Sequence, residues 1–247
     1  MSILLEISVE SLEGAKIAEQ NGADRIELCS AIELGGLTPS WALMSLAKKY
    51  LSIPIFALIR PRSGDFLYSE DEFQTIIADI VQAKVLGLDG IVIGFLLPSG
   101  NIDIERTRKV CELAKPMQVT FNRAFDLCKD SCQGLEDIIT AGCSKLLTSG
   151  QAENAEKGIA VIKKLVIQSN NRISIIAGAG VKAKNVNKII AQTKVVEVHT
   201  TAKMKKESNM EFRKNGVSMG NNIVSEFSIP SIDKNIIKEI RKTINTL

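Results

Sequence analysis

The run TFNRAFD, residues 120–126, carries an amide, a guanidinium and a carboxylate in a stretch whose apolar pattern is typical of a buried strand. A charge in an apolar wall is costly unless it is paired or hydrogen-bonded. We therefore expect Asn122, Arg123 and Asp126 to line a polar opening, where Arg123 would bind an anion and Asp126 would transfer a proton. Ion pairs that only stabilise the fold are the alternative for each single residue.

A second polar run, LIRPRSGDFLYS at residues 58–69, holds two arginines on either side of Pro61. The proline restricts the turn and Asp65 suits a tight bend, so two forked donors would face the same opening. Arg60 and Arg62 together suit a carboxylate or a phosphate. A salt bridge from Asp65 to either arginine is the structural alternative, and it is compatible with binding.

The single histidine of the chain, His199, closes the run VEVH, and Glu197 lies two residues earlier on the same side of a strand. Its imidazole suits a general acid or base, and a hydrogen-bonded core histidine is an equal alternative. In the run AGAGV, Gly178 and Gly180 would let backbone N–H groups approach a phosphate or another anion. Glycines of a simple turn would look the same.

Other catalytic and metal chemistry has little support in the sequence. There is no GxSxG motif, and Lys145 starts its predicted strand, where a Schiff-base lysine would end it. Thiols are the remaining soft ligands. Cys29 ends the second predicted strand, and Cys128 and Cys132 would share a face if their stretch is helical. Cytosolic thiols at such spacing are more often ordinary residues than a copper site.

Eight β-branched runs alternate with helical patterns along the chain, and no gap is typical of a domain linker. Glycines in NGADRIEL, LGLDGIVI and AGCSKLLT precede three of the strands and suit the left-handed end of a helix. Eight βα units in about 250 residues predict an α/β protein, a single-domain TIM-type (β/α)8 barrel, with a doubly wound open sheet as the competing fold. The predicted strands are 3–8, 25–29, 55–60, 90–94, 118–123, 145–148, 173–177 and 195–200, and the clearest helices are 11–21, 70–86, 104–114, 155–168 and 232–244.

The carboxyl ends of barrel strands meet at one rim, so residues far apart in the sequence are expected to face one mouth. We predict that three arginines bind a small anionic substrate there and that two carboxylates or the histidine transfer protons. The predicted binding set is Glu6, Arg60, Arg62, Asp65, Asn122, Arg123, Gly178 and Gly180, and the proton-transfer set is Glu27, Asp126 and His199.

Composition narrows the class of protein. With 247 residues, 45% of them hydrophobic, the chain can bury a large core, and a net charge of +3 is too small to indicate a nucleic-acid or membrane partner. No cationic segment precedes the N-terminal apolar run, and no apolar run is long enough to span a bilayer. Five irregularly spaced cysteines do not suggest a disulfide framework, so we expect a cytoplasmic protein with reduced thiols.

The segment 203–230, after the eighth predicted strand, is longer and more polar than a usual connection in such a barrel. We expect it to be a long loop. It could fold over the mouth as a lid to which Arg213 contributes, or it could form an oligomer contact, and the sequence favours neither role.

The motifs occur in the order found in the CutC family, which the chain resembles from residue 4 to about 220. The matching runs are LLEI, NGADRIELC, GGLTPS, IRPRSGDFLYS, TFNRAFD, LLTSG, AGAGV, EVHTTA and FRKNGVSMG. The resemblance implies a TIM-type barrel, a cytoplasmic location, a homo-oligomer and an association with copper homeostasis. It places the family's strand-end residues on Glu6, Glu27, Arg60, Arg62, Asp65, Arg123, Asp126 and His199.

Copper proposals for the family rest on thiols at the ends of the first two strands. Here the second is Cys29, the candidate metal ligand, whereas the first is Ser8, and Asn122 replaces the histidine of the family's usual TFHRAFD. Cu(I) favours thiolate, thioether and imidazole ligands. Two functions stay open: copper binding without turnover, or a barrel enzyme of unassigned reaction acting on a small anionic substrate. The soft ligands that support copper are Cys29, Cys128, Cys132, Met204, Met210 and Met219.

Overall fold

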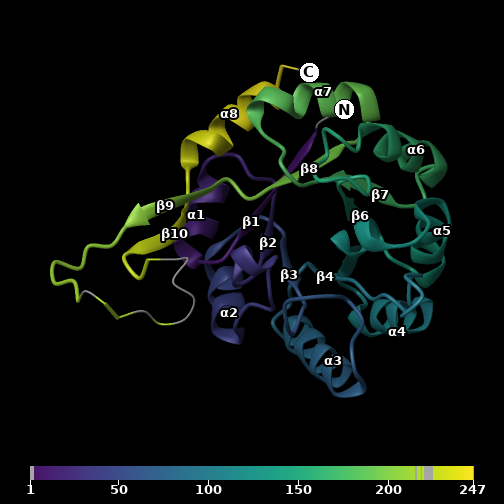
Figure 1. The fold of residues 1–247 in the computed structure, drawn as a ribbon, viewed down its shortest axis with the longest axis horizontal. Coiled ribbons are helices and arrows are strands. Elements are labelled where there is room, and N and C mark those ends of the chain that lie inside the picture. Colours follow the sequence, from purple (N-terminus) through teal and green to yellow (C-terminus); the bar gives the residue numbers. More distant parts are fainter. Residues whose placement is uncertain (1–2, 215, 218, 220–224, 247) are drawn as a thin grey trace.

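Eight parallel strands close into a barrel with helices around it in the computed structural model of the chain, which describes residues 3–214, 216–217, 219 and 225–246 (Figure 1). The barrel strands are β1 Leu4–Val9, β2 Arg25–Leu28, β3 Ile55–Leu58, β4 Gly90–Ile93, β5 Gln118–Phe121, β6 Lys145–Thr148, β7 Ser174–Ala177 and β8 Glu197–Thr200. β1 pairs with β8 as well as with β2, so the sheet has no open edge. This closure excludes the open doubly wound sheet and confirms the predicted single-domain (β/α)8 barrel.

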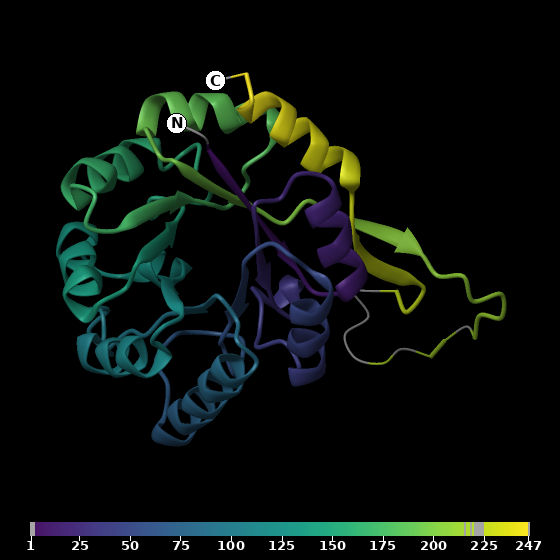
Figure 2. The same ribbon diagram turned by 180° about the vertical axis from the view of Figure 1, so that it is seen from behind.

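The helices form an outer ring around the strands, as the view from behind also shows (Figure 2). Several begin at polar caps: the Ser11 hydroxyl accepts a hydrogen bond from the N–H of Gly14, and Ser69 forms a capping box with Glu72. None of the helices within the described ranges is long and apolar enough to cross a bilayer. The helices are α1 Leu12–Gln20, α2 Trp41–Tyr50, α3 Glu70–Val85, α4 Ile104–Ala114, α5 Ser131–Ala141, α6 Ile159–Ser169, α7 Ala183–Thr193 and α8 Lys234–Ile244, with two short 3₁₀ helices, η1 Ile32–Leu34 and η2 Arg123–Leu127.

The predicted joints between helices and strands are confirmed. Gly22, Gly87 and Gly142 have φ angles of 103°, 70° and 97°, in the left-handed region that glycine adopts without strain. Each follows a helix and leads within a few residues into the next strand. These turns bring the chain back to the sheet, so that all eight strands run in the same direction.

The faces of the first two strands show how the barrel divides its residues. Leu5 and Ile7 on β1 belong to the main hydrophobic core between strands and helices. Glu6 alternates with them and contacts Arg25 of β2, so both charged side chains lie inside the barrel. A small separate apolar cluster of Cys29, Phe56, Leu58 and Val92 also lies inside. The barrel interior is therefore partly apolar and partly charged.

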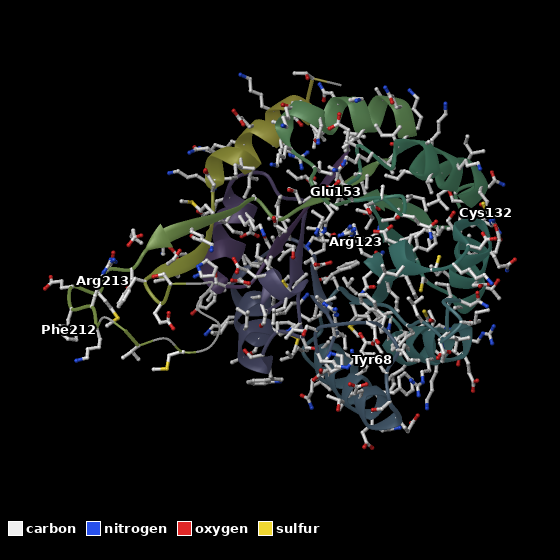
Figure 3. The ribbon with its side chains drawn as sticks, viewed as in Figure 1. Tyr68, Arg123, Cys132, Glu153, Phe212 and Arg213 are labelled. Atoms are coloured by element: carbon white, nitrogen blue, oxygen red, sulfur yellow. The ribbon has the colours of Figure 1, made fainter. Side chains whose placement is uncertain are left out.

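The segment 203–230, expected as a loop, instead contains β9 Lys203–Glu207 and the first part of β10 Ser228–Ile232. These two strands pair antiparallel in a ribbon beside the barrel, and we call residues 203–232 the arm. Arg213 lies at the outer end of the arm, far from Arg123 near the middle of the barrel (Figure 3). Residues 215, 218 and 220–224 of this segment lie outside the described residues. The roles of lid and oligomer contact both stay predictions.

Candidate active site at the barrel mouth

A cavity of about 950 Å³ opens where the barrel strands end. Side chains that follow β2, β3, β5 and β8 meet in its wall, as do residues of the loop after β7. The structure therefore brings together most of the residues that the sequence singled out. Those that line the cavity are Glu27, Cys29, Arg60, Asn122, Arg123, Asp126, Gly180 and His199.

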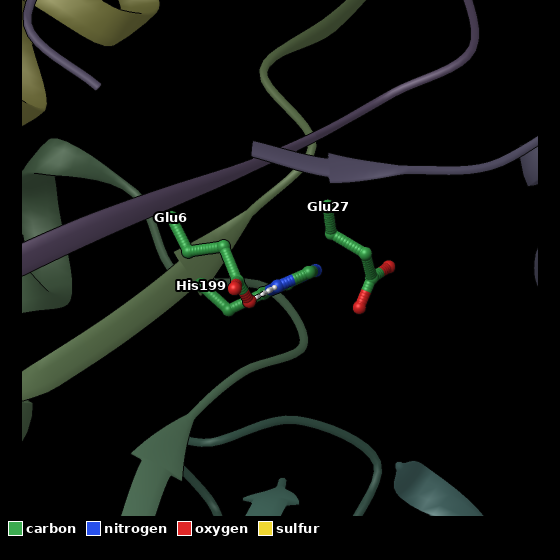
Figure 4. A group of neighbouring side chains, drawn as sticks. All are labelled: Glu6, Glu27 and His199. Atoms are coloured by element: carbon green, nitrogen blue, oxygen red, sulfur yellow. Dashed lines mark hydrogen bonds and ion pairs between the residues drawn. The ribbon is translucent and has the colours of Figure 1, made fainter. Parts of the chain in front are cut away.

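The ring of His199 lies between two carboxylates, Glu6 and Glu27 (Figure 4), and both His199 and Glu27 line this cavity. The Nδ1 atom of His199 is 2.7 Å from Oε1 of Glu6. One nitrogen or oxygen atom from each of the three residues lies within 4.8 Å of the other two. Exposed fractions of 1% for Glu6, 6% for Glu27 and 8% for His199 mean that water screens these charges weakly.

Glu6 is ionised. Burial alone would raise the pKa of its carboxyl group, but the charge of Arg25 and the hydrogen bond from His199 lower it to about 2. An ionised carboxylate only accepts hydrogen bonds, so Nδ1 of His199 carries the hydrogen that points at Glu6. The other ring nitrogen, Nε2, is directed toward Glu27, and it is the atom that gains or loses a proton.

The pKa of Glu27 is shifted in the opposite direction to that of Glu6. Burial raises the pKa of its carboxyl group, and this outweighs the lowering by the charge of His199 and by the Ser8 hydroxyl, which donates to Oε1 at 3.1 Å. Burial would lower the pKa of His199, but the charges of Glu27 and Glu6 raise it. Two neighbouring groups with raised pKa values can share a proton and exchange it with a ligand.

Four further residues extend the charge network below Glu6. Arg25 donates from Nε to Glu6 at 2.5 Å and from Nη2 to Glu197 at 2.6 Å. Glu197 also accepts from Lys145 and Ser174, each at 2.6 Å. Arg25 and Ser174 were not among the residues predicted from the sequence. The signal was present, because polar residues at every second position of buried strands must face the inside of a closed sheet.

Arg60 is a buried cation without a carboxylate partner in the described part of the chain. It is 5% exposed, and its guanidinium donates to three backbone carbonyls, those of Leu34, Gly36 and Gly64, at 3.1, 3.2 and 2.6 Å. The ring of Phe66 lies against it at 4.7 Å. Its Nε has no hydrogen-bond partner. A buried donor of this kind is costly unless a ligand satisfies it.

Arg62 and Asp65 do not belong to the cavity lining. Arg62 donates from Nε to Glu72 at 2.5 Å and from Nη2 to Asp65 at 3.1 Å. The salt bridge that the sequence left open is therefore present, and it ties the loop after β3 to the start of α3. Neither residue is in a position to contact a ligand on the floor of the cavity.

Asp126 lines the cavity, but both of its carboxylate oxygens already accept hydrogen bonds from neighbouring residues. It accepts from Thr148 Oγ1 at 2.5 Å, from Ser149 Oγ at 2.9 Å, and from the N–H groups of Ser149 and Gln151. Arg123 donates to it from Nε at 2.8 Å and is 45% exposed, with its side chain near the middle of the barrel (Figure 3). Asp126 thus holds the loop after β6 and orients Arg123, which suits it less to proton transfer.

The remaining predicted binding residues have local roles. Oδ1 of Asn122 accepts from the N–H of Ala124 at 2.8 Å and caps the short helix η2. Gly178 packs closely against Leu147, whose side chain would have to move away from a Cβ atom placed at 2.5 Å. Gly180, with φ of 71°, lines the cavity just before α7. Its backbone is placed where a ligand could approach the start of that helix.

The thiols do not form a soft metal site. Cys29 is 1% exposed, and burial, together with the charge of Glu27, raises the pKa of its thiol to about 12. Cys128 ends η2, and Asp130 caps the start of α5, so Cys128 and Cys132 are not on one helix face as the sequence allowed. Cys132 lies at the outer edge of the molecule (Figure 3).

Fold and site together define a (β/α)8-barrel protein with a carboxylate–imidazole–carboxylate group at the cavity where the strands end. The profile of the CutC family matches residues 3–204, and the chain belongs to this family. A CutC family protein of Vibrio campbellii is 44% identical over 247 residues, which cover 99% of this chain and all of the relative. One from Glaesserella parasuis is 49% identical over 84% of this chain and 85% of its own.

Two solved structures extend the comparison. A CutC protein of Streptococcus agalactiae, provisionally described as a copper homeostasis protein, superposes with a TM-score of 0.76 and 32% identity over 80% of this chain and 97% of its own. Phosphoribosylanthranilate isomerase of Pyrococcus furiosus has a TM-score of 0.59 at 14% identity, covering 99% of this chain and all of its own. This second likeness concerns the barrel fold alone.

The donor atoms at the mouth do not fit the copper that the family association implies. Within the described residues, the one cluster of three or more His, Cys, Asp and Glu side chains is Glu6, Glu27 and His199, and it contains no thiol. Cu(I) favours thiolate, thioether and imidazole ligands, whereas this cluster offers one imidazole and two carboxylates. The charge of Glu6 is already matched by Arg25. A bound cation would have to displace that pairing.

Proposed function

We propose that this protein is an enzyme that binds a small anionic molecule in the barrel cavity and moves a proton on it. His199 and Glu27 are the catalytic residues, and Glu6 is a positioning residue that fixes the imidazole. The observation that carries this proposal is the imidazole between two carboxylates, one held ionised and one with a raised pKa. Opposed pKa shifts in neighbouring groups are typical of acid and base pairs in active sites.

The anionic character of the substrate follows from Arg60. A buried guanidinium with an unsatisfied Nε and no carboxylate partner in the described residues gives the wall of the cavity a positive charge. A carboxylate or phosphate group of the ligand would be attracted by this charge. Arg123 offers a second, more exposed guanidinium. Ala183 and Lys184 at the start of α7 also line the cavity, and their N–H groups have no partner inside the helix.

Ligand binding can be tested with two arginine variants from the same loop. Small carboxylates and phosphate monoesters, each at millimolar concentration, are screened for a rise in the melting temperature of the wild type, since a ligand of the native state stabilises it. The stabilisation should disappear in Arg60→Gln and persist in Arg62→Gln, whose arginine binds Glu72 outside the cavity. If no compound stabilises the wild type more than Arg60→Gln, the anionic substrate is wrong.

Proton transfer is tested on the compounds that bind. The protein is incubated with each in D₂O, and exchange of carbon-bound hydrogen is followed by NMR. We expect wild-type protein to catalyse exchange in at least one compound, with a loss of about 100-fold or more in His199→Gln and in Glu27→Gln. Arg62→Gln serves as the matched control. Binding without any exchange would leave a binding protein and remove the enzymatic proposal.

Copper binding is the second candidate, because the CutC protein of Streptococcus agalactiae is provisionally described in terms of copper homeostasis. Anaerobic Cu(I) titration of the reduced protein, beside Cys29→Ser, tests it directly. Because the cluster of Glu6, Glu27 and His199 contains no sulfur, we expect Cu(I) to bind weakly and with the same affinity in Cys29→Ser. Stoichiometric, tight binding that is lost in Cys29→Ser would favour copper handling over the enzymatic proposal.

We also propose a cytoplasmic location. All five cysteines are free thiols, and the two nearest, Cys111 and Cys143, keep their sulfur atoms 3.6 Å apart without a bond. Free thiols so close together persist in a reducing compartment. Separation of cell fractions, with antibody detection of the untagged chain, would test the location.

A further inference from the structure

The charged side chains inside the barrel form one continuous column that ends at His199. It runs from Lys145 to Glu197 at 2.6 Å, from Glu197 to Arg25 at 2.6 Å, from Arg25 to Glu6 at 2.5 Å, and from Glu6 to His199 at 2.7 Å. Each contact is a charge-assisted hydrogen bond between side chains with little exposure. Arg25 and Lys145 also line a separate cavity of about 550 Å³ at the opposite end of the barrel.

We propose that Glu197 and Lys145 are positioning residues of the catalytic histidine, acting on it through Arg25 and Glu6. Arg25 binds two carboxylates at once, so the guanidinium fork fixes the distance between Glu6 and Glu197. Glu197 neutralises part of the charge of Arg25, and Lys145 in turn neutralises part of the charge of Glu197. The proposal deepens the proposed function, on which the catalytic meaning of His199 rests.

The column transmits charge and does not conduct protons. A guanidinium keeps its proton under all ordinary conditions, so Arg25 interrupts any proton path between Lys145 and Glu6. Protons at His199 must therefore exchange through Nε2, on the side of Glu27 and the mouth. The charges of Lys145, Glu197 and Arg25 thus influence the protonation of His199, whereas proton exchange takes place only at its Nε2 atom.

The sign of each effect follows from the charges that surround the imidazole. Removing the negative charge of Glu197 leaves more of the positive charge of Arg25 unbalanced, which disfavours the protonated imidazole. Removing the positive charge of Lys145 has the opposite effect. The charged and titratable groups inside the barrel are Glu6 on β1, Arg25 and Glu27 on β2 with Cys29 after it, Lys145 on β6 and Glu197 on β8 itself. Those in the wall of the cavity above are Arg60, Arg123, Asp126, Lys182, Lys184, Lys203 and Glu239, and none of them is changed in the experiment.

The single histidine makes the experiment direct. The ring protons of His199 give the sole imidazole signals of the chain, so their chemical shifts can be followed by NMR between pH 5 and 9 without assignment of other residues. Nitrogen shifts of the ring report in the same samples whether Nδ1 keeps its hydrogen. The variants are Glu197→Gln, Lys145→Gln and Lys145→Arg, with Glu136→Gln, in an exposed pair with Arg172, as the matched control.

We expect the midpoint for His199 to fall in Glu197→Gln and to rise in Lys145→Gln, each by roughly 0.5–1 pH unit for charges coupled at an effective dielectric constant of about 20. Lys145→Arg and Glu136→Gln should leave it unchanged, and Nδ1 should stay protonated throughout. Titration midpoints of His199 that move in the same direction in both glutamine variants, or that do not move, would overturn the proposal. A non-specific loss of structure would not shift the midpoint in opposite directions according to the charge that is removed.

The experiment stays decisive if one variant does not fold, and it distinguishes this proposal from the proposed function. If Glu197→Gln does not fold, the comparison of Lys145→Gln with Lys145→Arg decides alone, because a rise in the first and none in the second still requires the charge. The titration needs no substrate, so opposite shifts in a protein that catalyses no exchange would leave the column standing and the proposed function wrong. Catalysed exchange with unmoved midpoints would leave the function standing and the column wrong.

Discussion

Arg60 and Arg62 flank Pro61 in one loop, yet only Arg60 lines the cavity. In the structure Arg60 is buried in the cavity wall, whereas Arg62 binds Glu72 at the start of α3. The difference depends on a partner ten residues away and on which direction the chain takes after β3. Neither is visible in the pattern of the loop, but the strand-end rule correctly predicted where Arg60 lies.

The cysteines should differ in how fast their thiols react. Cys29 is 1% exposed with a thiol pKa of about 12, so at pH 7.5 its thiolate fraction is roughly a thousandfold below that of an ordinary cysteine. Cys132 is exposed. We expect alkylation of the native protein, followed by mass spectrometry, to modify one thiol rapidly. That fast phase should vanish in Cys132→Ser and remain in Cys29→Ser, and rapid modification of Cys29 would contradict the buried environment.

At the scale of elements, the regular parts of the barrel were predictable and the connections were not. Strands follow from β-branched runs and helix ends from glycines such as Gly142, because these signals are local. The pairing of β9 with β10 depends on contacts between segments separated by 20 residues or more, so the arm could not be read from its polar sequence. Likewise, the Asp130 cap that separates Cys128 from α5 was overlooked.

The loop after β6 is held in place by hydrogen bonds to Asp126, and its stability should depend on them. Asp126 accepts hydrogen bonds from Thr148, Ser149, Gln151 and Arg123, and its side chain is 6% exposed. Asp126→Asn replaces an acceptor oxygen by a donor and removes the charge, which should lower the free energy of unfolding by about 2–4 kcal/mol, since hydrogen bonds to a charged group are the stronger kind. Urea denaturation followed by circular dichroism measures this.

The matched control for that loop is Asp130→Asn at the start of α5. Asparagine caps a helix about as well as aspartate, so this variant should lose at most about 0.5 kcal/mol. Equal losses in the two variants would mean that the hydrogen bonds of Asp126 add nothing beyond an ordinary cap.

For the whole molecule, the interior of the barrel is where sequence reasoning fell short. The closed sheet was predicted, and with it the mouth, because eight βα units leave few other topologies. The column of Arg25, Glu6 and Glu197 was not, although its members alternate with apolar residues along β1, β2 and β8. Charge inside a barrel goes against the expectation of an apolar filling, and only the pairwise distances show that each charge has a partner.

This column predicts how the stability of the molecule changes with pH. The folded-state pKa of Glu6 is about 2 against a usual value of 4.5, and that of Glu197 is also lowered, so both stabilise the fold when ionised. Their contribution is complete above the unfolded pKa near 4.5 and is lost as the pH falls through the folded value. For Glu6 alone the loss amounts to roughly 3 kcal/mol. Glu27, with its raised pKa, changes stability in the opposite direction, but only above this window.

Urea denaturation at a series of pH values from 5 to 2, in roughly 0.5 M salt to screen exposed pairs such as Glu136 with Arg172, measures the slope. Wild-type stability should fall steeply below pH 4.5. The slope should be shallower in Glu6→Gln, which cannot titrate there and starts from a lower stability because Arg25 loses a partner. Glu105→Gln, at an exposed position of α4, should keep the wild-type slope. Identical slopes in Glu6→Gln and the wild type would mean that the interior carboxylates are not ionised in the folded protein, and the charged column would lose its basis.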